Sequence, residues 1–554
     1  MTAFILISGL IFLNQNPVSG ASLSGPWKLT GTLPANPVGQ DSILLLMEAS
    51  NNPGPWKVLD HGISAFNGSK VQATSVNQKS VILSIKGPVS IDVFLKAKSS
   101  SPDRWVGTFE LRGNWFPCVL ERVKTNSLAD EKKEQPTPGS DFYSSLVKAE
   151  GIDSKIKLAQ EIIDKHHSSP ASIKAAQLII DQIISTKDSN NLDHGLKILN
   201  EATNDYPFQL SNPILGSTIS MMVRQKFELA KAEKLLDIIK KEHIEPVGLL
   251  SRRNILKLEA GIYPLVGKTN EGKEAIAKLD TIEKSLDAEF EKTSIPFKVS
   301  PANLKNSANN RPRVLELFTG AQCPPCVAAD IAFDALDKSY TSGDLILLQY
   351  HLHIPGPDPL TNAHSEMRAK YYGINSTPSA YIDGASGPAV GGFKPNAQSA
   401  FNKLSAALNA ENRSTDFASA SLVIKSKKSE NGFILDVQHD KIDKPQQLLL
   451  RLILVENSVR YQGRNGQRIH HQVVRYFLGD PKGIAISNSK GSQEISVHTS
   501  MIKSELETFL EVSNKRRPFL DDERPLELSN LSVIGLLQHI ETKEIVQAAK
   551  VPLK

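Results

Sequence analysis

The chain has 554 residues, of which 40% are hydrophobic and 22% are charged, as in folded globular proteins of about three or four domains. Its 64 Lys and Arg residues exceed its 59 Asp and Glu residues by a net charge of only +5, and no basic block concentrates the excess. This balance gives no support to binding of nucleic acid or of a membrane surface. Three cysteines, Cys118, Cys323 and Cys326, are too few for a disulfide-rich scaffold.

Residues 1–20 have the features of a signal peptide. Their apolar run, Thr2 to Leu13, is too short to span a membrane, and small residues near Gly20 offer a cleavage site. We therefore expect an exported protein with no transmembrane anchor beyond this signal. No Lys or Arg precedes the apolar run, so a retained N-terminus or a wrongly assigned start is the alternative.

Residues 21–124 alternate short apolar runs with Gly, Asn and Pro, which predicts an all-β domain. We expect a small sandwich or barrel with Trp27, Trp105 and Trp115 in its core or at its rim. A carbohydrate or protein contact through exposed Trp is the alternative. Cys118 is expected to be an inert core thiol, with a role as third partner in disulfide exchange as the alternative.

A charged linker that also contains Pro and Gly, residues 125–140, leads into a predicted α-helical domain, residues 141–295. Apolar residues such as Ile152 and Ile156 recur there every three or four positions. Similar helical segments recur at a spacing in the mid-thirties of residues, as in tetratricopeptide-like helix pairs. The characteristic Trp, Gly and Tyr residues of that repeat are absent. The expectation is an irregular solenoid, a type of module that usually binds protein. Residues 296–312, rich in Asn, Pro and Ser, form a second linker.

Residues 313–410 open with the pattern of a redox site. An apolar strand and a polar turn precede Cys323-Pro324-Pro325-Cys326, and an Ala-rich helical segment follows. A cysteine at such a turn lies at a helix N-terminus, where the helix dipole favours the thiolate. Pro324 and Pro325 suit the active-site turn because their φ is already helical and no donor is needed there. Cys323 is therefore the predicted nucleophile and Cys326 the resolving thiol.

Several further features of this stretch form a pattern together with the two cysteines. They are Leu315-Glu316-Leu317-Phe318-Thr319, Tyr350-His351-Leu352-His353, Asp358-Pro359, Arg368, Tyr371-Tyr372, Thr377-Pro378 and Tyr381-Ile382-Asp383-Gly384. The pattern resembles an exported, poorly characterised bacterial branch of the thioredoxin superfamily, over roughly a hundred residues.

This resemblance implies an α/β thioredoxin-like domain whose two motif cysteines form a redox-active disulfide. In that family the proline before the last two strands is cis and lies against the disulfide, which identifies it with Pro378. Thr377 is then expected to contact the client backbone. Two residues differ from thioredoxin itself, since Gln322 replaces a Trp and Leu317 replaces a buried Asp. The second difference leaves the proton acceptor for Cys326 unassigned.

His351 and His353 end a predicted strand, and strand alternation places both imidazoles on one face. Together with Cys323 and Cys326 they make a Cys2His2 set of the kind that binds zinc or copper. Metal binding or delivery is therefore the first alternative function. Dithiol chemistry explains the cysteine motif without it, so we expect no metal and no cofactor.

Residues 411–554 return to short apolar runs, which predicts a C-terminal β-sandwich. One of its strands is expected over residues 506–512. A polar cluster between Arg460 and Arg475 contains His470 and His471, which as strand neighbours point to opposite faces. Structural hydrogen bonding is the expected role of these two histidines.

The expected function is that of a thiol-disulfide oxidoreductase outside the cytoplasm, in the periplasm or secreted from a bacterial envelope. Its partners would be protein thiols and disulfides and an envelope redox partner. A non-catalytic adaptor is the second alternative function. The motif does not set the redox direction, because reductants, oxidants and isomerases share it.

Overall fold

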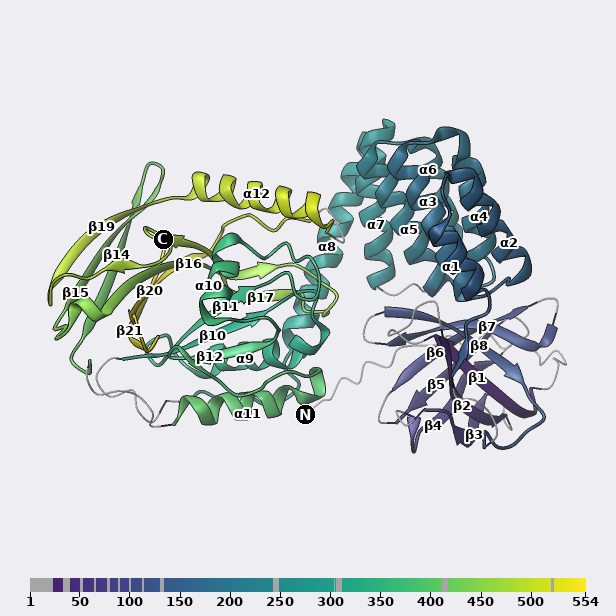
Figure 1. Cartoon of the computed structure of the whole chain (residues 1–554), viewed down its shortest axis with the longest axis horizontal. Helices are drawn as coiled ribbons and strands as arrows, with labels where there is room; N and C mark the ends of the chain where they lie inside the picture. Colours follow the sequence, from purple (N-terminus) through teal and green to yellow (C-terminus); the bar gives the residue numbers. More distant parts are fainter. Residues whose placement is uncertain are drawn as a thin grey trace, which may run out of the picture. The chain divides into compact units, whose positions relative to one another are not determined.

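A computed structural model gives the structure of the chain (Figure 1). It describes most of the chain, namely residues 23–32, 40–49, 53–63, 66–76, 80–87, 90–98, 101–111, 114–129, 134–242, 249–302, 304, 311–410, 417–519 and 523–554. The predicted signal peptide, residues 1–20, and parts of both predicted linkers lie outside these ranges. The chain divides into two compact units, Met1–Thr281 and Ile282–Lys554.

The first unit begins with an antiparallel β-barrel of eight strands. Its sheet order is β1-β8-β7-β6-β5-β4-β3-β2-β9, and pairing of β1 with β2 closes the barrel. The strands are β1 (Gly25–Thr32), β2 (Gln40–Ala49), β3 (Gly54–His61), β4 (Lys70–Val76), β5 (Ser80–Lys86), β6 (Ile91–Lys98), β7 (Ser101–Leu111), β8 (Asn114–Arg122) and the short β9 (Glu134–Pro136). Closure leaves none of the eight strands with an unpaired edge.

Two of the three predicted aromatic residues lie in the barrel core, since Trp27 and Trp105 are buried there. Trp115 is only partly buried; it packs edge-on against Phe94 and against the core of the helical module. The alternative of an exposed Trp contact surface therefore does not hold for Trp27 or Trp105. Cys118 is a free thiol buried in the same core, and burial raises its pKa far above the ordinary value, so it has the properties of an inert core thiol.

A helical module follows, as predicted. Its helices are α1 (Ser140–Lys148), α2 (Ile152–Lys165), α3 (Pro170–Thr186), α4 (Ser189–Thr203), α5 (Phe208–Gln225), α6 (Leu229–Glu242), α7 (Leu249–Ile262) and α8 (Thr269–Thr293). Two of these helices begin at N-cap residues that the sequence shows. Ser169 caps α3, whose first residue is Pro170, and the Asp188 side chain accepts hydrogen bonds from two backbone N–H groups at the start of α4. The boundary between the two units falls inside α8. No helix in the described ranges is long and apolar enough to cross a membrane.

The second unit is built on a nine-stranded mixed sheet. The order is β13-β12-β10-β11-β17-β16-β20-β21, with β18 also paired to β16. The strands are β10 (Arg313–Thr319), β11 (Leu345–His351), β12 (Ser379–Ile382), β13 (Ala385–Ser386), β16 (Leu448–Arg460), β17 (Ile469–Leu478), β18 (Ile484–Ala485), β20 (Leu531–His539) and β21 (Ile545–Pro552). Central β10 is parallel to β11 and antiparallel to β12.

Helices cover both faces of this sheet around β10 (Figure 1). Leu315 and Leu317 pack with α9 (Val327–Ser339) and α11 (Ala397–Leu408). Val314 and Phe318 point the other way, into a cluster that includes Ala369 of α10 (Ala363–Tyr372). Burial on both faces explains why β10 is almost entirely apolar in sequence.

The C-terminal region differs from the predicted separate β-sandwich of residues 411–554. Four of its long strands, β16, β17, β20 and β21, extend the sheet that contains β10. Its other long strands form a three-stranded sheet of β14 (Ser421–Ser429), β15 (Gly432–Asp440) and β19 (Gly491–His498). The residues from 313 onward therefore belong to one unit. Sequence spacing does not reveal this, because strand pairing joins segments more than 100 residues apart.

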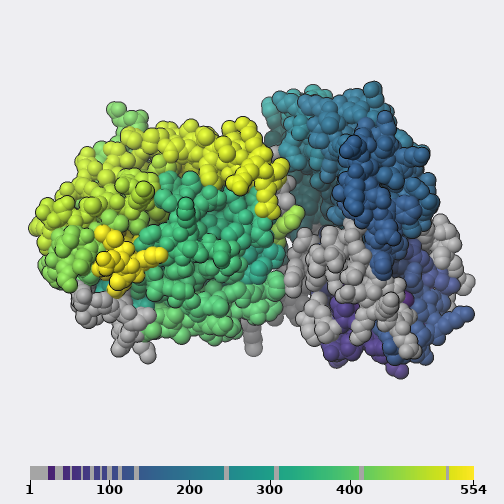
Figure 2. Space-filling view, in the orientation of Figure 1, coloured from purple at the N-terminus to yellow at the C-terminus, as the bar shows by residue number. Residues whose placement is uncertain are grey.

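The predicted strand over residues 506–512 is wrong, because this segment lies within helix α12 (Thr499–Arg516). The buried residues Ile502, Leu506 and Leu510 recur every four positions, which is a helical spacing. A longer stretch of sequence that begins at Ile502 distinguishes a helix from a strand here. The solvent-facing side of α12 forms part of the surface of this unit (Figure 2).

Candidate functional site

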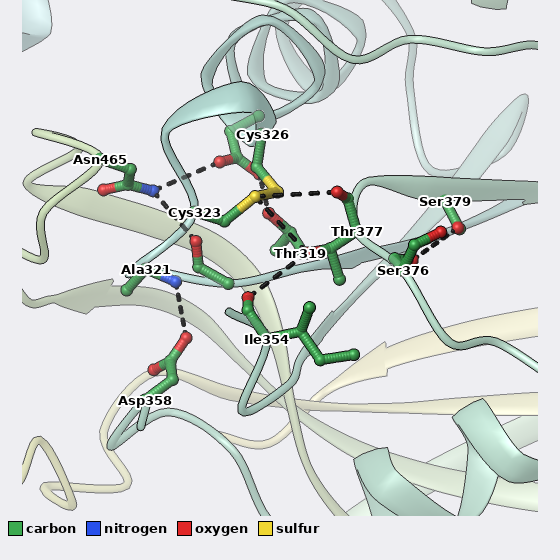
Figure 3. Close-up of a disulfide and its surroundings, with 12 residues drawn as sticks. Thr319, Ala321, Cys323, Cys326, Ile354, Asp358, Ser376, Thr377, Ser379 and Asn465 are labelled. Carbon is green, nitrogen blue, oxygen red and sulfur yellow. Dashed lines mark hydrogen bonds between the residues drawn. A yellow bond between two sulfur atoms is a disulfide. The ribbon is translucent and has the colours of Figure 1, made fainter. Parts of the chain in front are cut away.

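The site lies where β10 ends and α9 begins. Cys323 and Cys326 form a disulfide with a Cα–Cα distance of 5.4 Å (Figure 3). Pro324 and Pro325 make a short 3-10 turn that leads directly into α9. The Cys323 N–H donates to the Gly320 carbonyl and the Cys326 N–H to the Cys323 carbonyl, both at 3.0 Å. The disulfide is thus held at a helix N-terminus, where unpaired N–H groups and the dipole favour negative charge.

The Thr377–Pro378 peptide faces this disulfide. It is cis, and the Thr377 hydroxyl oxygen lies 3.4 Å from the Cys323 Sγ, with the Thr377 carbonyl oxygen 3.9 Å from the same sulfur (Figure 3). The Thr377 hydroxyl also donates to the Ile354 carbonyl at 3.3 Å. The structure therefore brings Cys323, Cys326 and Thr377 together at one site, while their chemical roles stay predictions.

Both sulfurs are covered. Cys323 is 1% exposed and Cys326 0% exposed, whereas the neighbouring Pro325 and Ser376 are exposed. Solvent and small molecules thus reach the rim of the site more easily than the disulfide itself. Any exchange reaction must first open a path to the Cys323 sulfur.

Residues 461–468, named here the covering segment, pack against the turn that precedes Cys323. The Gln322 amide donates to the Tyr461 hydroxyl at 3.2 Å, and the Arg464 N–H donates to the Gln322 amide oxygen at 3.2 Å. The Asn465 N–H donates to the Ala321 carbonyl at 3.0 Å. Gln322 therefore makes two of the hydrogen bonds that join the covering segment to the turn before Cys323.

Two arginines anchor the covering segment to α8. Arg468 contacts Glu283 at 2.5 Å and Asp287 at 2.7 Å, and Arg460, just before the segment, contacts the same two carboxylates at 2.6 and 2.8 Å. Arg468 and Glu283 are both largely buried. This ion-pair cluster fixes the end of the covering segment, because charge-assisted bonds between largely buried groups are strong and directional.

The two strand-end histidines both bind Asp358. The His351 Nδ1 lies 2.8 Å from the Asp358 carboxylate, and the His353 Nδ1 accepts the Asp358 N–H at 3.0 Å. That carboxylate also accepts the Ala321 N–H at 2.6 Å. Burial opposes the charge, yet His351 and these hydrogen bonds lower the pKa of Asp358. The histidines thereby support the turn before the cysteines.

The structure does not join these histidines to the cysteines in a metal centre. Among the described residues, no group of three or more His, Cys, Asp or Glu side chains is arranged to hold a metal ion. His470 stacks edge-on against His351 and binds the Tyr461 carbonyl, whereas His471 binds Asp334. The adjacent histidines thus point to different partners and serve as structural hydrogen-bonding groups.

One buried carboxyl near the disulfide escaped the sequence reasoning. Asp330 of α9 is 3% exposed and accepts hydrogen bonds from the Thr319 hydroxyl at 2.7 Å and from the Gln349 amide at 3.3 Å. The Asn465 amide lies 3.5 Å from its other oxygen. Burial, together with Asp334 and Asp358, raises the pKa of Asp330 to about 8. The available signal was two aspartates, Asp330 and Asp334, four positions apart in the otherwise apolar residues 327–336.

Glu316, the acidic neighbour of Leu317, lies on the other face of the sheet. Its two carboxylate oxygens accept hydrogen bonds from Arg368 at 2.8 and 2.9 Å, and the Tyr372 hydroxyl donates to it at 2.7 Å. Both charged side chains are buried. Glu316 is thus committed to a structural ion pair on the face opposite Leu317.

No protein-family model and no curated protein matches the sequence. Among solved structures, the chain is similar to HBP35 of Porphyromonas gingivalis, with 16% identity and a TM-score of 0.29. The similar region covers 44% of this chain and 75% of that protein.

Proposed function

We propose that the chain exchanges thiols and disulfides with protein clients through a thioredoxin-like domain around Cys323 and Cys326. The observation that carries this proposal is a Cys-Pro-Pro-Cys disulfide at a helix start that faces a Thr–cis-Pro peptide. A helix N-terminus stabilises a thiolate, which is the reactive form in exchange. The sequence resemblance, which includes the same Cys and Thr-Pro motifs, agrees with this proposal.

In the reducing direction the Cys323 thiolate attacks one sulfur of a client disulfide. A bond forms between Cys323 and the client, and the other client sulfur leaves as a thiolate that takes up a proton. The Cys326 thiol then loses its proton and attacks the Cys323 sulfur, which re-forms the Cys323–Cys326 bond and releases the second client thiolate. The reverse sequence donates a disulfide to a client.

The surroundings suit an extended client at this site. The Thr377 carbonyl lies beside the Cys323 sulfur, so its backbone is placed to bond a client strand, as edge-strand recognition does elsewhere. The exposed Pro325 and Ser376 border the same position. Export to a bacterial periplasm or exterior, an oxidising setting in which disulfides persist, is part of the proposal, as is an envelope redox partner.

Trapping of client mixed disulfides tests the proposed function. A Cys326→Ser variant, with Cys118→Ser in the background, is expected to retain clients on Cys323 because the resolving thiol is missing. The matched Cys323→Ser variant is expected to trap none. Equal trapping by the two variants would contradict the assignment of Cys323 as the nucleophile. A glutathione titration of the wild-type pair would then give the redox direction.

The second candidate function is a non-catalytic adaptor with a structural disulfide. The burial of both sulfurs favours it, because inaccessible cysteines are generally inert. If so, neither variant traps a client and the folded chain resists reduction by dithiothreitol. Reduction only after unfolding would establish the adaptor and overturn the exchange reaction.

A further inference from the structure

We infer that Asp330 is the proton acceptor for the Cys326 thiol when the pair re-forms its disulfide. The inference rests on the proposed function and deepens it, because that function needs a base for Cys326. Leu317 offers no acceptor, and Glu316 is bound to Arg368 on the opposite face of the sheet.

Helix geometry places Cys326 and Asp330 about one turn apart on the same face of α9. Cys326 caps α9 with helical backbone angles, and Asp330 follows four positions later. Residues at this spacing lie on the same face of a helix, with about 5–6 Å between their Cβ atoms. Two donors to Asp330 belong to the site itself, since Thr319 ends β10 and Asn465 also binds Gly320.

The environment of Asp330 suits proton exchange near neutral pH. Its carboxyl is buried and bonded to neutral donors, so burial raises its pKa to about 8. A base with a pKa near the working pH is the most effective proton acceptor. A carboxylate with an ordinary pKa would be too weak a base for a buried thiol.

Other titratable groups surround Asp330. On α9, Asp334 lies one turn further and binds His471 of β17, while Asp358 beyond β11 binds His351. Both aspartates raise the pKa of Asp330. The hydrogen bond from Gln349 links Asp330 to His351, whose Nε2 lies 3.3 Å from the Gln349 amide oxygen.

The proposed step moves one proton and exchanges one disulfide bond for another. In the mixed disulfide between Cys323 and a client, the Cys326 thiol gives its proton to the Asp330 carboxylate. The Cys326 sulfur then attacks the Cys323 sulfur, and the client leaves as a thiolate. The protonated Asp330 returns its proton to solvent or to the leaving thiolate, so the cycle leaves Asp330 unchanged.

Oxidation of the reduced full-length chain by glutathione disulfide tests this step. Reactions at pH 6 to 9.5 are quenched with acid, and mass spectrometry separates the reduced, mixed-disulfide and closed forms. In the wild type, formation of the Cys323–Cys326 disulfide (closing) quickly follows formation of the mixed disulfide between Cys323 and glutathione (capture). The rate of closing levels off above about pH 8. In Asp330→Asn, capture by Cys323 is unchanged, but closing at pH 7 slows at least about tenfold. The deficit shrinks at higher pH, where Cys326 ionises by itself.

Asp334→Asn is the matched control, because it makes the same change one turn along α9. Its rate of disulfide closure at pH 7 should not fall below about half that of the wild type, and the plateau should move to lower pH because Asp334 raises the pKa of Asp330. Thr319→Val gives a second readout. The Thr319 hydrogen bond lowers the pKa of Asp330, so its loss moves the plateau of closing to higher pH.

Normal capture with an unchanged closing rate in Asp330→Asn would overturn the role of Asp330 alone. If Asp330→Asn does not fold, an unshifted closing profile in Thr319→Val overturns it. A wild-type chain that captures no glutathione overturns the proposed function as well.

Discussion

Gly463 is the point at which a single methyl group should lift the covering segment off the site. A Cβ at this position would lie 2.1 Å from the Ala321 carbonyl oxygen and 2.6 Å from its carbon. Both are backbone atoms, so no side-chain rotation relieves the clash. To accept Gly463→Ala, the covering segment and the turn before Cys323 must separate by about 1 Å.

The cost follows from the contacts that this separation breaks. Three hydrogen bonds of 3.0–3.2 Å join the covering segment to Ala321 and Gln322. At about 1 kcal/mol each, their loss amounts to about 3 kcal/mol, at the upper end of ordinary overpacking costs. Since 1.4 kcal/mol is a factor of ten, a reaction that requires this segment to open should accelerate by as much as about 100-fold.

The assay is the rate of disulfide reduction by dithiothreitol, together with the urea midpoint of the unit that contains the site. Gly463→Ala is expected to react faster and to unfold at about 1 M less urea, for an m-value of about 3 kcal/mol/M. Gly343→Ala is the control, because its Cβ would meet no atom closer than 3.6 Å. A reduction rate within twofold of wild type would refute the view that the covering segment limits access to Cys323.

Three further predictions concern buried ionisable groups. Glu316→Gln leaves the Arg368 charge without its carboxylate and should lower the free energy of unfolding by about 3–5 kcal/mol, measured with urea. The double variant Glu316→Leu with Arg368→Met should recover most of this loss. Equal urea midpoints for the single and the double variant would contradict this expectation. Burial alone would lower the pKa of His471, but Asp334 raises it. The contribution of His471 to the free energy of unfolding is therefore complete below about pH 6.5 and disappears as pH rises through the higher folded pKa. A difference in urea midpoint between wild type and His471→Gln that grows with pH would contradict this. Cys118, whose pKa burial raises, should react with thiol reagents only after unfolding, and rapid labelling of the native chain at pH 8 would disprove its inertness.

The sequence was sufficient for features that local chemistry determines. The all-β character of residues 21–124, the helical module and the strand–turn–helix around Cys323 all follow from periods of two and 3.6 residues and from Pro at a helix start, whereas closure of the strands into a barrel does not. The segment at Leu506 was misjudged because seven residues can match either period. The longer repeat from Ile502 through Leu510 resolves it in favour of the helix.

The parts that sequence reasoning missed share one physical cause, namely contacts between residues far apart in the chain. Asn465 binds Asp330 across 135 positions, and Gln322 binds Tyr461 across 139. No local pattern predicts such pairs, because strand pairing and ion pairs at a distant helix place residue 465 beside the cysteines. The same contacts assign a role to Gln322, because its side-chain amide binds Tyr461 and Arg464 of the covering segment. The covering segment therefore holds the turn before Cys323 through contacts that only the folded chain brings together, and Gly463→Ala tests whether this turn must move before the Cys323 sulfur can react.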